Sequence, residues 1–175
     1  PFLFPGPKIM RHPKAVLFAG EKPFPILPAV DHYAGSEKLM KKALQLQKEL
    51  GPIFDITCDC EDGAHAGAER EHAEMAAALI MSEDNLFNRV GARVHDVTHP
   101  HWRQDMEILV GIAGRRLPFI TLPKPCSAGD VKVQIEALRE IEQNFGVDRR
   151  IPVHVLIETH GALREVWEIA ALPGV

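Results

Sequence analysis

The feature that most constrains the fold is a strict alternation of short apolar runs with amphipathic segments. Each apolar run has the length and composition of a buried strand, and each segment between two runs has hydrophobic residues at helical spacing. Alternation of this kind predicts a parallel sheet with right-handed crossovers. The predicted strands are 25–30, 53–60, 89–95, 118–122 and 151–158, and the predicted helices are 36–50, 66–81, 102–113, 128–145 and 163–172.

Five such units in 175 residues amount to about 35 residues each, so eight would need roughly 280, as is usual for a closed (β/α)₈ barrel. We therefore predict an α/β chain that carries about the first five βα units of a TIM barrel, with residues 25–175 as the N-terminal part of that single domain. The chain has no initiator methionine and ends where a sixth strand is expected, so we expect it to be part of a longer barrel. Residues 1–24, rich in Pro and Gly, are expected to form an irregular N-terminal arm. The alternative is an open doubly wound sheet, but no G-x-G-x-x-G motif follows the first predicted strand.

Composition narrows the classes of partner. The net charge of −4 and the pI of about 6.1 argue against a nucleic acid, because phosphate binding requires a basic surface. No apolar run approaches the ~20 residues that cross a bilayer, so no membrane span is expected. The three cysteines, Cys58, Cys60 and Cys126, are an odd number and are expected to be reduced thiols, which is typical of a cytoplasmic protein.

Charged residues gather where predicted strands end. In a barrel these ends converge on one rim, and that rim holds the active site. Burying several charges together is costly unless they are paired or bind a cation, and Mg²⁺ is suited to a site with one or two carboxylates plus substrate and water. The sequence therefore predicts a small-molecule site with Mg²⁺ at this rim. The candidate residues are Asp59, Glu61 and Asp62 after the second strand, Arg93 and His95 at the third, Lys124 after the fourth and Glu158 at the fifth.

Five short motifs resemble, in the same order, those of citrate lyase β-chain-like enzymes, a family that includes malyl-CoA lyases. The resemblance runs from about Phe54 to Val175. Asp59-x-Glu61-Asp62 resembles D-L-E-D, Ala92-Arg93-Val94 resembles V-R-V-N, His99-Pro100-His101-Trp102-x-x-Asp105 resembles P-W-x-x-D, Leu122-Pro123-Lys124 resembles L-P-K, and Ile157-Glu158-Thr159 resembles I-E-T.

The resemblance implies a Mg²⁺-dependent carbon–carbon lyase with a (β/α)₈ fold that assembles as a homotrimer or homohexamer. Its substrate would be a hydroxyacyl-CoA ester of the citryl-CoA or malyl-CoA class. By the same resemblance, Glu158 is a metal ligand and a second ligand, an Asp after strand six, lies beyond Val175. Arg93 would bind the oxygen that becomes an enolate, and Glu61 and Asp62 would hold waters on the metal. The catalytic acid or base would come from a C-terminal segment of a neighbouring subunit.

Departures from the family pattern leave alternatives open. His95 stands where the family has Asn, and the family's R-S-x-L-F-V-P-G opening is replaced by residues 25–30. An aldolase that acts on free 2-oxo acids without CoA is one alternative, and a non-catalytic barrel that serves as a binding module is another. We expect His95 and Lys124 to contact substrate, although Lys124 could equally neutralise the acids. Zinc at His95, His99 and His101 is disfavoured because their spacing fits no familiar ligand pair.

Overall fold

Five parallel strands form one sheet in a computed structural model that describes residues 28–175. The strands follow one another across the sheet in chain order, β1 to β5. The predicted arm at 1–24 and the first half of the predicted first strand lie outside the described residues. The strands are β1 (Asp31–Ala34), β2 (Asp55–Asp59), β3 (Val90–Arg93), β4 (Ile120–Leu122) and β5 (Val153–Val155).

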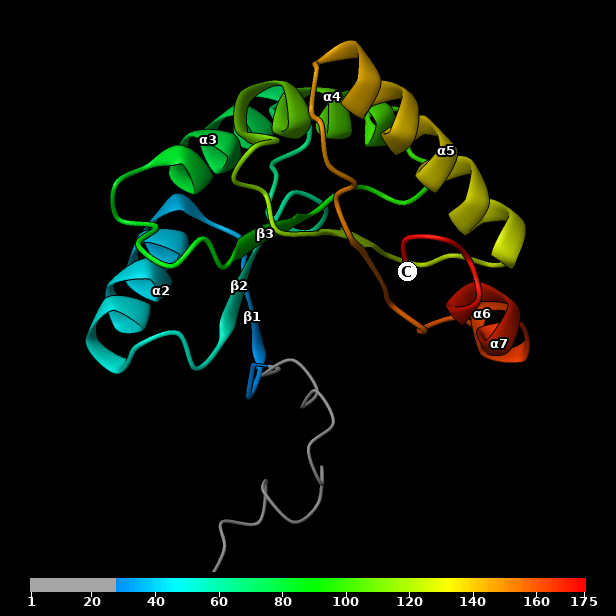
Figure 1. Ribbon diagram of the computed structural model, residues 1–175, viewed down its shortest axis with the longest axis horizontal. Coiled ribbons are helices and arrows are strands. Elements are labelled where there is room, and N and C mark those ends of the chain that lie inside the picture. Colours follow the sequence, from blue (N-terminus) through cyan, green and yellow to red (C-terminus); the bar gives the residue numbers. More distant parts are fainter. Residues whose placement is uncertain (1–27) are drawn as a thin grey trace, which may run out of the picture.

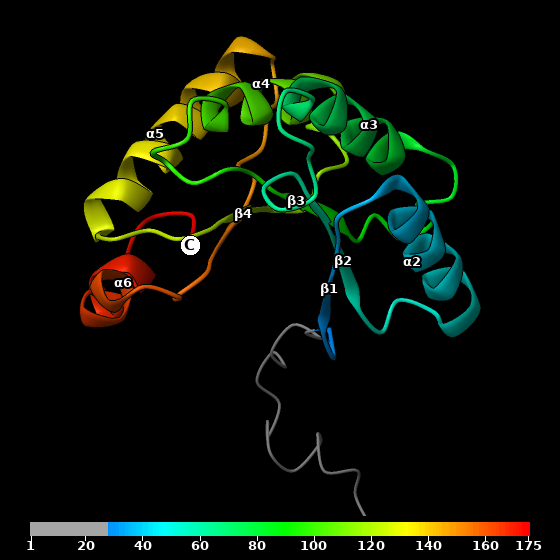
Figure 2. The ribbon, with the colours of Figure 1, turned by 180° about the vertical axis from the view of Figure 1, so that it is seen from behind.

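The helices lie along one side of this sheet. In Figures 1 and 2 they arch over the outer, convex side of the curved sheet and leave its concave side uncovered. A doubly wound sheet has helices on both faces and a reversal in strand order, so that alternative is wrong. The α/β prediction is confirmed, and the arrangement is that of consecutive units of a (β/α)₈ barrel. The helices are α2 (Glu37–Leu50), α3 (Glu69–Met81), α4 (Trp102–Ala113), α5 (Ala128–Asn144), α6 (His160–Arg164) and α7 (Val166–Ala170).

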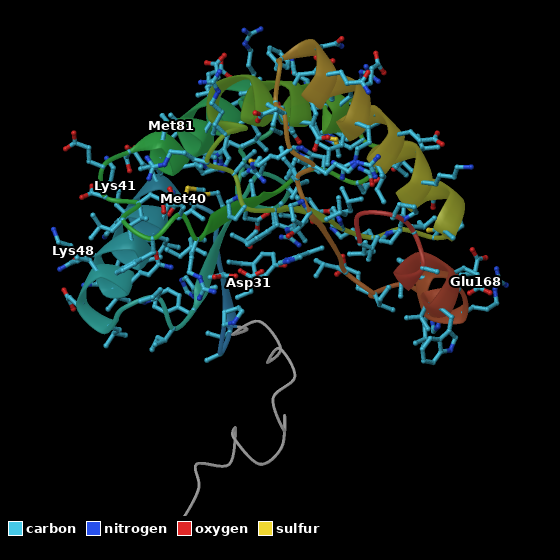
Figure 3. The ribbon with its side chains drawn as sticks, in the orientation of Figure 1. Asp31, Met40, Lys41, Lys48, Met81 and Glu168 are labelled. Atoms are coloured by element: carbon cyan, nitrogen blue, oxygen red, sulfur yellow. The ribbon has the colours of Figure 1, made fainter. Side chains whose placement is uncertain are left out.

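The two faces of the sheet differ in chemistry because successive side chains of a strand alternate between them. The helix-facing side chains are buried and apolar, and they form the core together with the inner faces of the helices. Met40 of α2, for example, points toward the sheet, whereas Lys41 and Lys48 lie on the outside (Figure 3). Thr57, Asp59, Arg93 and Thr121 alternate with these core residues and therefore line the concave face. A polar concave face is what a barrel enclosing a polar site requires.

Helix ends follow local capping chemistry. The Ser36 hydroxyl accepts a hydrogen bond from the Leu39 amide at the start of α2, and Gly51, with φ of +82°, ends that helix. Ser127 and Asp130 form a reciprocal capping box at the start of α5. The predicted bounds of the helix at 102–113 are confirmed, and those at 36–50 and 128–145 differ by a single residue at one end.

Two predicted elements were wrong. Within the described residues the first strand begins at Asp31, so residues 28–30 of the predicted 25–30 run precede it, and Pro28 cannot donate to a ladder. The predicted helix at 163–172 is two short helices that begin earlier, at His160, and are interrupted at Glu165. None of the described helices is long and apolar enough to cross a membrane.

Rings fill the concave face near the amino ends of the strands. The Phe119 ring lies so close over Gly91 that a Cβ there would come within 2.3 Å of it. The same ring stacks on His154, with ring centroids 4.1 Å apart. His154 lies on the concave face, since it pairs in register with Thr121 of β4. These rings form a floor beneath the polar residues at the opposite ends of the strands.

Candidate active site at the carboxyl ends of the strands

An ion pair between neighbouring strands forms the centre of the site. Parallel pairing places Asp59, the last residue of β2, directly beside Arg93, the last residue of β3. Arg93 Nε donates to Asp59 Oδ1 at 2.8 Å, and Nη2 donates to Oδ2 at 2.6 Å. Both side chains are almost completely buried. A buried bidentate pair of this kind fixes the orientation of the guanidinium.

The turn after β2 brings two further acids to the same guanidinium. Asp59 Oδ1 also accepts the amides of Glu61 and Asp62, at 3.1 and 3.3 Å, which folds the loop back over β3. Arg93 Nη1 then lies 2.9 Å from Glu61 Oε2, and Nη2 lies 2.7 Å from Asp62 Oδ2. Burial acts to lower the pKa of Arg93, but the three carboxylates raise it above its usual range. Arg93 is therefore a permanent positive charge.

A close backbone contact holds this acidic loop in place. A Cβ at Gly63 would meet the Asp59 carbonyl oxygen at 2.3 Å and the Gly35 carbonyl oxygen at 2.4 Å. Gly63 therefore lets the loop pack directly against the turn between β1 and α2. His72 of α3 adds a hydrogen bond of 2.9 Å to the Asp59 carbonyl oxygen. The positions of Glu61 and Asp62 thus depend on backbone packing as well as on Arg93.

Lys124 joins this cluster to the end of β5. Its Nζ lies 2.7 Å from Glu61 Oε1 and 3.8 Å from Asp62 Oδ1. Its backbone amide donates to Glu158 Oε1 at 2.9 Å. The adjacent Glu61 carboxylate raises the pKa of Lys124, so the side chain is an ammonium at neutral pH. One residue therefore contacts three of the carboxylates at the rim.

Lys124 adopts a left-handed backbone conformation, with φ of +50°, which is uncommon for a residue other than glycine. Contacts from the neighbouring loop hold it there. The Thr159 hydroxyl donates to the Pro125 carbonyl, and a Cβ at Gly161 would collide with the Cys126 carbonyl oxygen at 1.9 Å. Asp130 accepts the amide of Cys126 at 2.8 Å. Such strain persists only where the surroundings determine it, and it occurs often at functional sites.

His95 lies beside this cluster in a separate buried pair. Its Nδ1 lies 2.6 Å from Asp105 Oδ2, and its backbone amide donates to the same oxygen at 3.0 Å. The His99 ring stacks on its other side, with centroids 3.9 Å apart. Although burial acts to lower the pKa of His95, the hydrogen bond and charge of Asp105 raise it. The arrangement orients the imidazole and favours its charged form.

The structure thus brings Arg93, Glu61, Asp62 and Lys124 into direct contact and links Glu158 to them through the Lys124 amide. Within residues 28–175, His95 forms no hydrogen bond or ion pair with that group; it pairs instead with Asp105, which was not predicted. Asp59 was predicted at the rim, but no role was assigned to it, and the structure makes it the closest partner of Arg93. The signal that could have revealed its pairing with Arg93 is its position, since the last residues of adjacent parallel strands lie side by side.

The donor set at the rim suits a hard divalent cation. Carboxylate oxygens are the ligands that Mg²⁺ prefers, and it needs only one or two of them with water. Neither buried oxygen of Glu61 has a hydrogen-bond partner of regular geometry within residues 28–175, so its contacts with Arg93 and Lys124 are ion pairs only. In that same part of the chain, no group of three or more His, Cys, Asp or Glu side chains is close enough to hold a metal by itself. Four carboxylates at the rim face two cationic side chains, so two negative charges are in excess. The carboxylates are those of Asp59, Glu61, Asp62 and Glu158, and the cations are Arg93 and Lys124. This excess of negative charge favours the binding of a metal cation.

Comparison with known proteins identifies related chains. No protein-family model matches the sequence. L-malyl-CoA/β-methylmalyl-CoA lyase from Cereibacter sphaeroides is 30% identical over 119 residues, which cover 66% of this chain and 36% of that protein. A protein of the same name from another strain of that species is 32% identical over 82 residues, which cover 47% of this chain and 26% of the relative.

A solved structure provides the second comparison. The crystal structure of a citrate lyase from Burkholderia xenovorans LB400 is similar, with a TM-score of 0.82 and 51% sequence identity, over 86% of this chain and 47% of that one. The matched part of the chain therefore spans about a quarter to a half of the length of these relatives. A sequence identity of 51% together with the same fold indicates common descent, which fold similarity alone would not. The chain belongs to the citrate lyase and malyl-CoA lyase family.

Proposed function

We propose that the protein is a Mg²⁺-dependent carbon–carbon lyase that cleaves or forms a hydroxyacyl-CoA ester of the citryl-CoA or malyl-CoA class. The observation that carries the proposal is the fixed guanidinium of Arg93 at the strand ends, surrounded by Asp59, Glu61 and Asp62. The relatives support it, since their names describe lyases, among them lyases of malyl-CoA. A homotrimeric or homohexameric assembly and a cytoplasmic location belong to the same proposal.

Arg93 has a donor available for a reacting oxygen. A guanidinium carries five N–H groups. Nε and both N–H groups of Nη2 face Asp59 and Asp62, and one N–H of Nη1 faces Glu61, so one Nη1 N–H is left for substrate. Cleavage of the carbon–carbon bond leaves an enolate, and this donor would stabilise its developing negative charge. Because three carboxylates already hold the guanidinium, little reorganisation is needed when that charge appears.

The remaining residues have roles at the same rim. Glu158 would be a ligand of Mg²⁺, while Glu61 and Asp62 would hold water molecules on it. When bound, the ion would supply Lewis acidity to the substrate oxygens. Lys124 orients the Glu158 carboxylate through its backbone amide. Lys124 and His95 would add positive charge that favours an anionic substrate, and Asp105 fixes the ring of His95.

The test is cleavage of malyl-CoA and citryl-CoA with and without EDTA. Activity that EDTA abolishes and Mg²⁺ restores supports the proposal, whereas metal-independent cleavage contradicts it. Replacing Arg93 with Ala should lower kcat by about 10²–10³, the usual cost of losing one oxyanion donor. Glu158→Gln should weaken metal binding, and Glu168→Gln, an exposed acid on α7 (Figure 3), is the matched control that should change nothing. Product formed from free 2-oxo acids but not from CoA esters would instead favour the aldolase.

A further inference from the structure

We propose that the Lys124 ammonium is a built-in counter-cation of the acidic loop, and that a divalent cation displaces it from Glu61 and Asp62 on binding. The inference rests on the proposed function, since the competing cation is the one that the lyase would use. It concerns the response of Lys124 to that ion. Lys124 Nζ lies 2.7 Å from Glu61 Oε1 and 3.8 Å from Asp62 Oδ1.

Glu61 needs a positive charge in every state of the site. Its side chain is only 6% exposed, and a buried carboxylate without a charged partner is strongly unfavourable. Arg93 Nη1 contacts one of its oxygens and Lys124 Nζ contacts the other. A divalent cation that takes the second oxygen, directly or through water, must therefore replace Lys124 or share the position with it.

Of the two cations, only Lys124 is free to leave. The Arg93 side chain is 10% exposed and is held by three carboxylates, two of them through hydrogen bonds of 2.6–2.8 Å. The Lys124 side chain is 47% exposed and ends in a point charge on a flexible stem. Movement of Lys124 into solvent breaks two ion pairs and leaves the Arg93 cluster intact.

The backbone of Lys124 would stay in place when the side chain moves. Its left-handed conformation is held by the loop after β5, through Thr159 and Gly161. Its amide donates to Glu158, the expected metal ligand. Lys124 thus keeps the ligand carboxylate oriented through its main chain, while its side chain competes with the metal for the neighbouring acids.

The experiment compares Mn²⁺ binding, by calorimetry, in the wild-type protein, Lys124→Met and Lys38→Met, an exposed lysine on α2 that serves as the control. Without the competing ammonium, Lys124→Met should bind Mn²⁺ about tenfold more tightly, equivalent to about 1.4 kcal/mol. Its metal-free melting temperature should fall, and Mn²⁺ should restore it to the wild-type value. Binding by Lys124→Met that is equal to or weaker than wild-type binding would overturn the inference.

A second measurement needs no variant. Acetylation of Lys124 in the wild-type protein, followed by mass spectrometry, should become faster when Mn²⁺ is added, while acetylation of Lys38 stays constant. An unchanged or slower rate at Lys124 contradicts displacement. Wild-type protein that binds no Mn²⁺ would overturn both this inference and the metal dependence of the proposed lyase. Tighter binding by Lys124→Met in a protein without lyase activity would remove the proposed function and leave this inference standing.

Discussion

Replacing Asp59 with Asn should lower the free energy of unfolding by about 2 kcal/mol. An Asn side chain keeps one oxygen, which can still accept from Arg93 Nε and from the amides of Glu61 and Asp62. The loss is therefore one negative charge and the hydrogen bond between Arg93 Nη2 and Asp59 Oδ2. A hydrogen bond to a charged group contributes about 1.5–3 kcal/mol. Removing a whole partner from a buried pair costs about 3–5 kcal/mol, but Arg93 keeps two other carboxylates, so the smaller value applies.

Urea denaturation measures this difference, and Asp84→Asn, an exposed Asp in the loop after α3, is the matched control. The midpoint should fall while the slope of the transition stays constant, because the surface exposed on unfolding is unchanged. For a chain of this size, about 2 kcal/mol corresponds to a fall in melting temperature of about 4–8 °C. If Asp59→Asn and Asp84→Asn agree within about 0.5 kcal/mol, the pair does not stabilise the fold and the reasoning is refuted.

Three further outcomes follow from single contacts. The raised pKa of His95 means that its pair with Asp105 stabilises the protein fully below the ordinary imidazole pKa of about 6.5 and less as pH rises through the folded-state value. The stability advantage of wild type over His95→Asn should therefore shrink toward alkaline pH, and a constant difference would contradict the pairing. Gly91→Ala should lower the free energy of unfolding, measured in urea or by heating, by about 1–3 kcal/mol, because the added methyl group would overpack against the Phe119 ring. The control is Gly129→Ala in the first turn of α5, which should be neutral or stabilising. A thiol reagent at pH 8 should label Cys126 alone in the native chain and all three cysteines after denaturation, and rapid labelling of a second native thiol would contradict the burial of the other two.

Helices were predicted more closely than strands, and the reason is physical. A helix carries its own capping signals in sequence, as Ser36 and Gly51 do for α2. A strand is defined by its neighbour, so its bounds depend on pairing that sequence does not contain. The first strand was misplaced because Asp31 and Tyr33 face the polar interior, where the Thr57 hydroxyl donates to Asp31 and the Arg93 guanidinium lies 5.3 Å from the Tyr33 ring. A search for apolar runs does not detect this strand, because two of its four residues, Asp31 and His32, are polar.

The position of the site was predictable because the carboxyl ends of parallel strands meet on one rim. That rule placed Arg93, Glu61, Asp62 and Lys124 together, and the structure has them in contact. The pairings themselves depend on three-dimensional details. Only the register reveals that Asp59 is the principal partner of Arg93.

The same limit applies to the two residues expected to contact substrate. The hydrogen bond from the Lys124 amide to Glu158 depends on the left-handed backbone conformation of Lys124. The sequence does not predict that conformation, because a lysine between two prolines gives no reason to expect positive φ. His95 was expected at the rim, and its burial against Asp105 depends on where the first turn of α4 lies relative to β3. Both features are set by packing between elements that are distant in the sequence.

The register of β3 sets both the electrostatics and the packing of the site. Gly91 and Arg93 are two residues apart, so they share the concave face, and a shift of one residue would move both to the helix side. Gly91 gives room for the Phe119 ring, and that ring forms a floor beneath the guanidinium together with His154. The Phe119 side chain is buried, whereas His154 is exposed, so Phe119 is the apolar part of this floor. The absence of a side chain at Gly91 therefore determines the packing of the concave face two residues before Arg93.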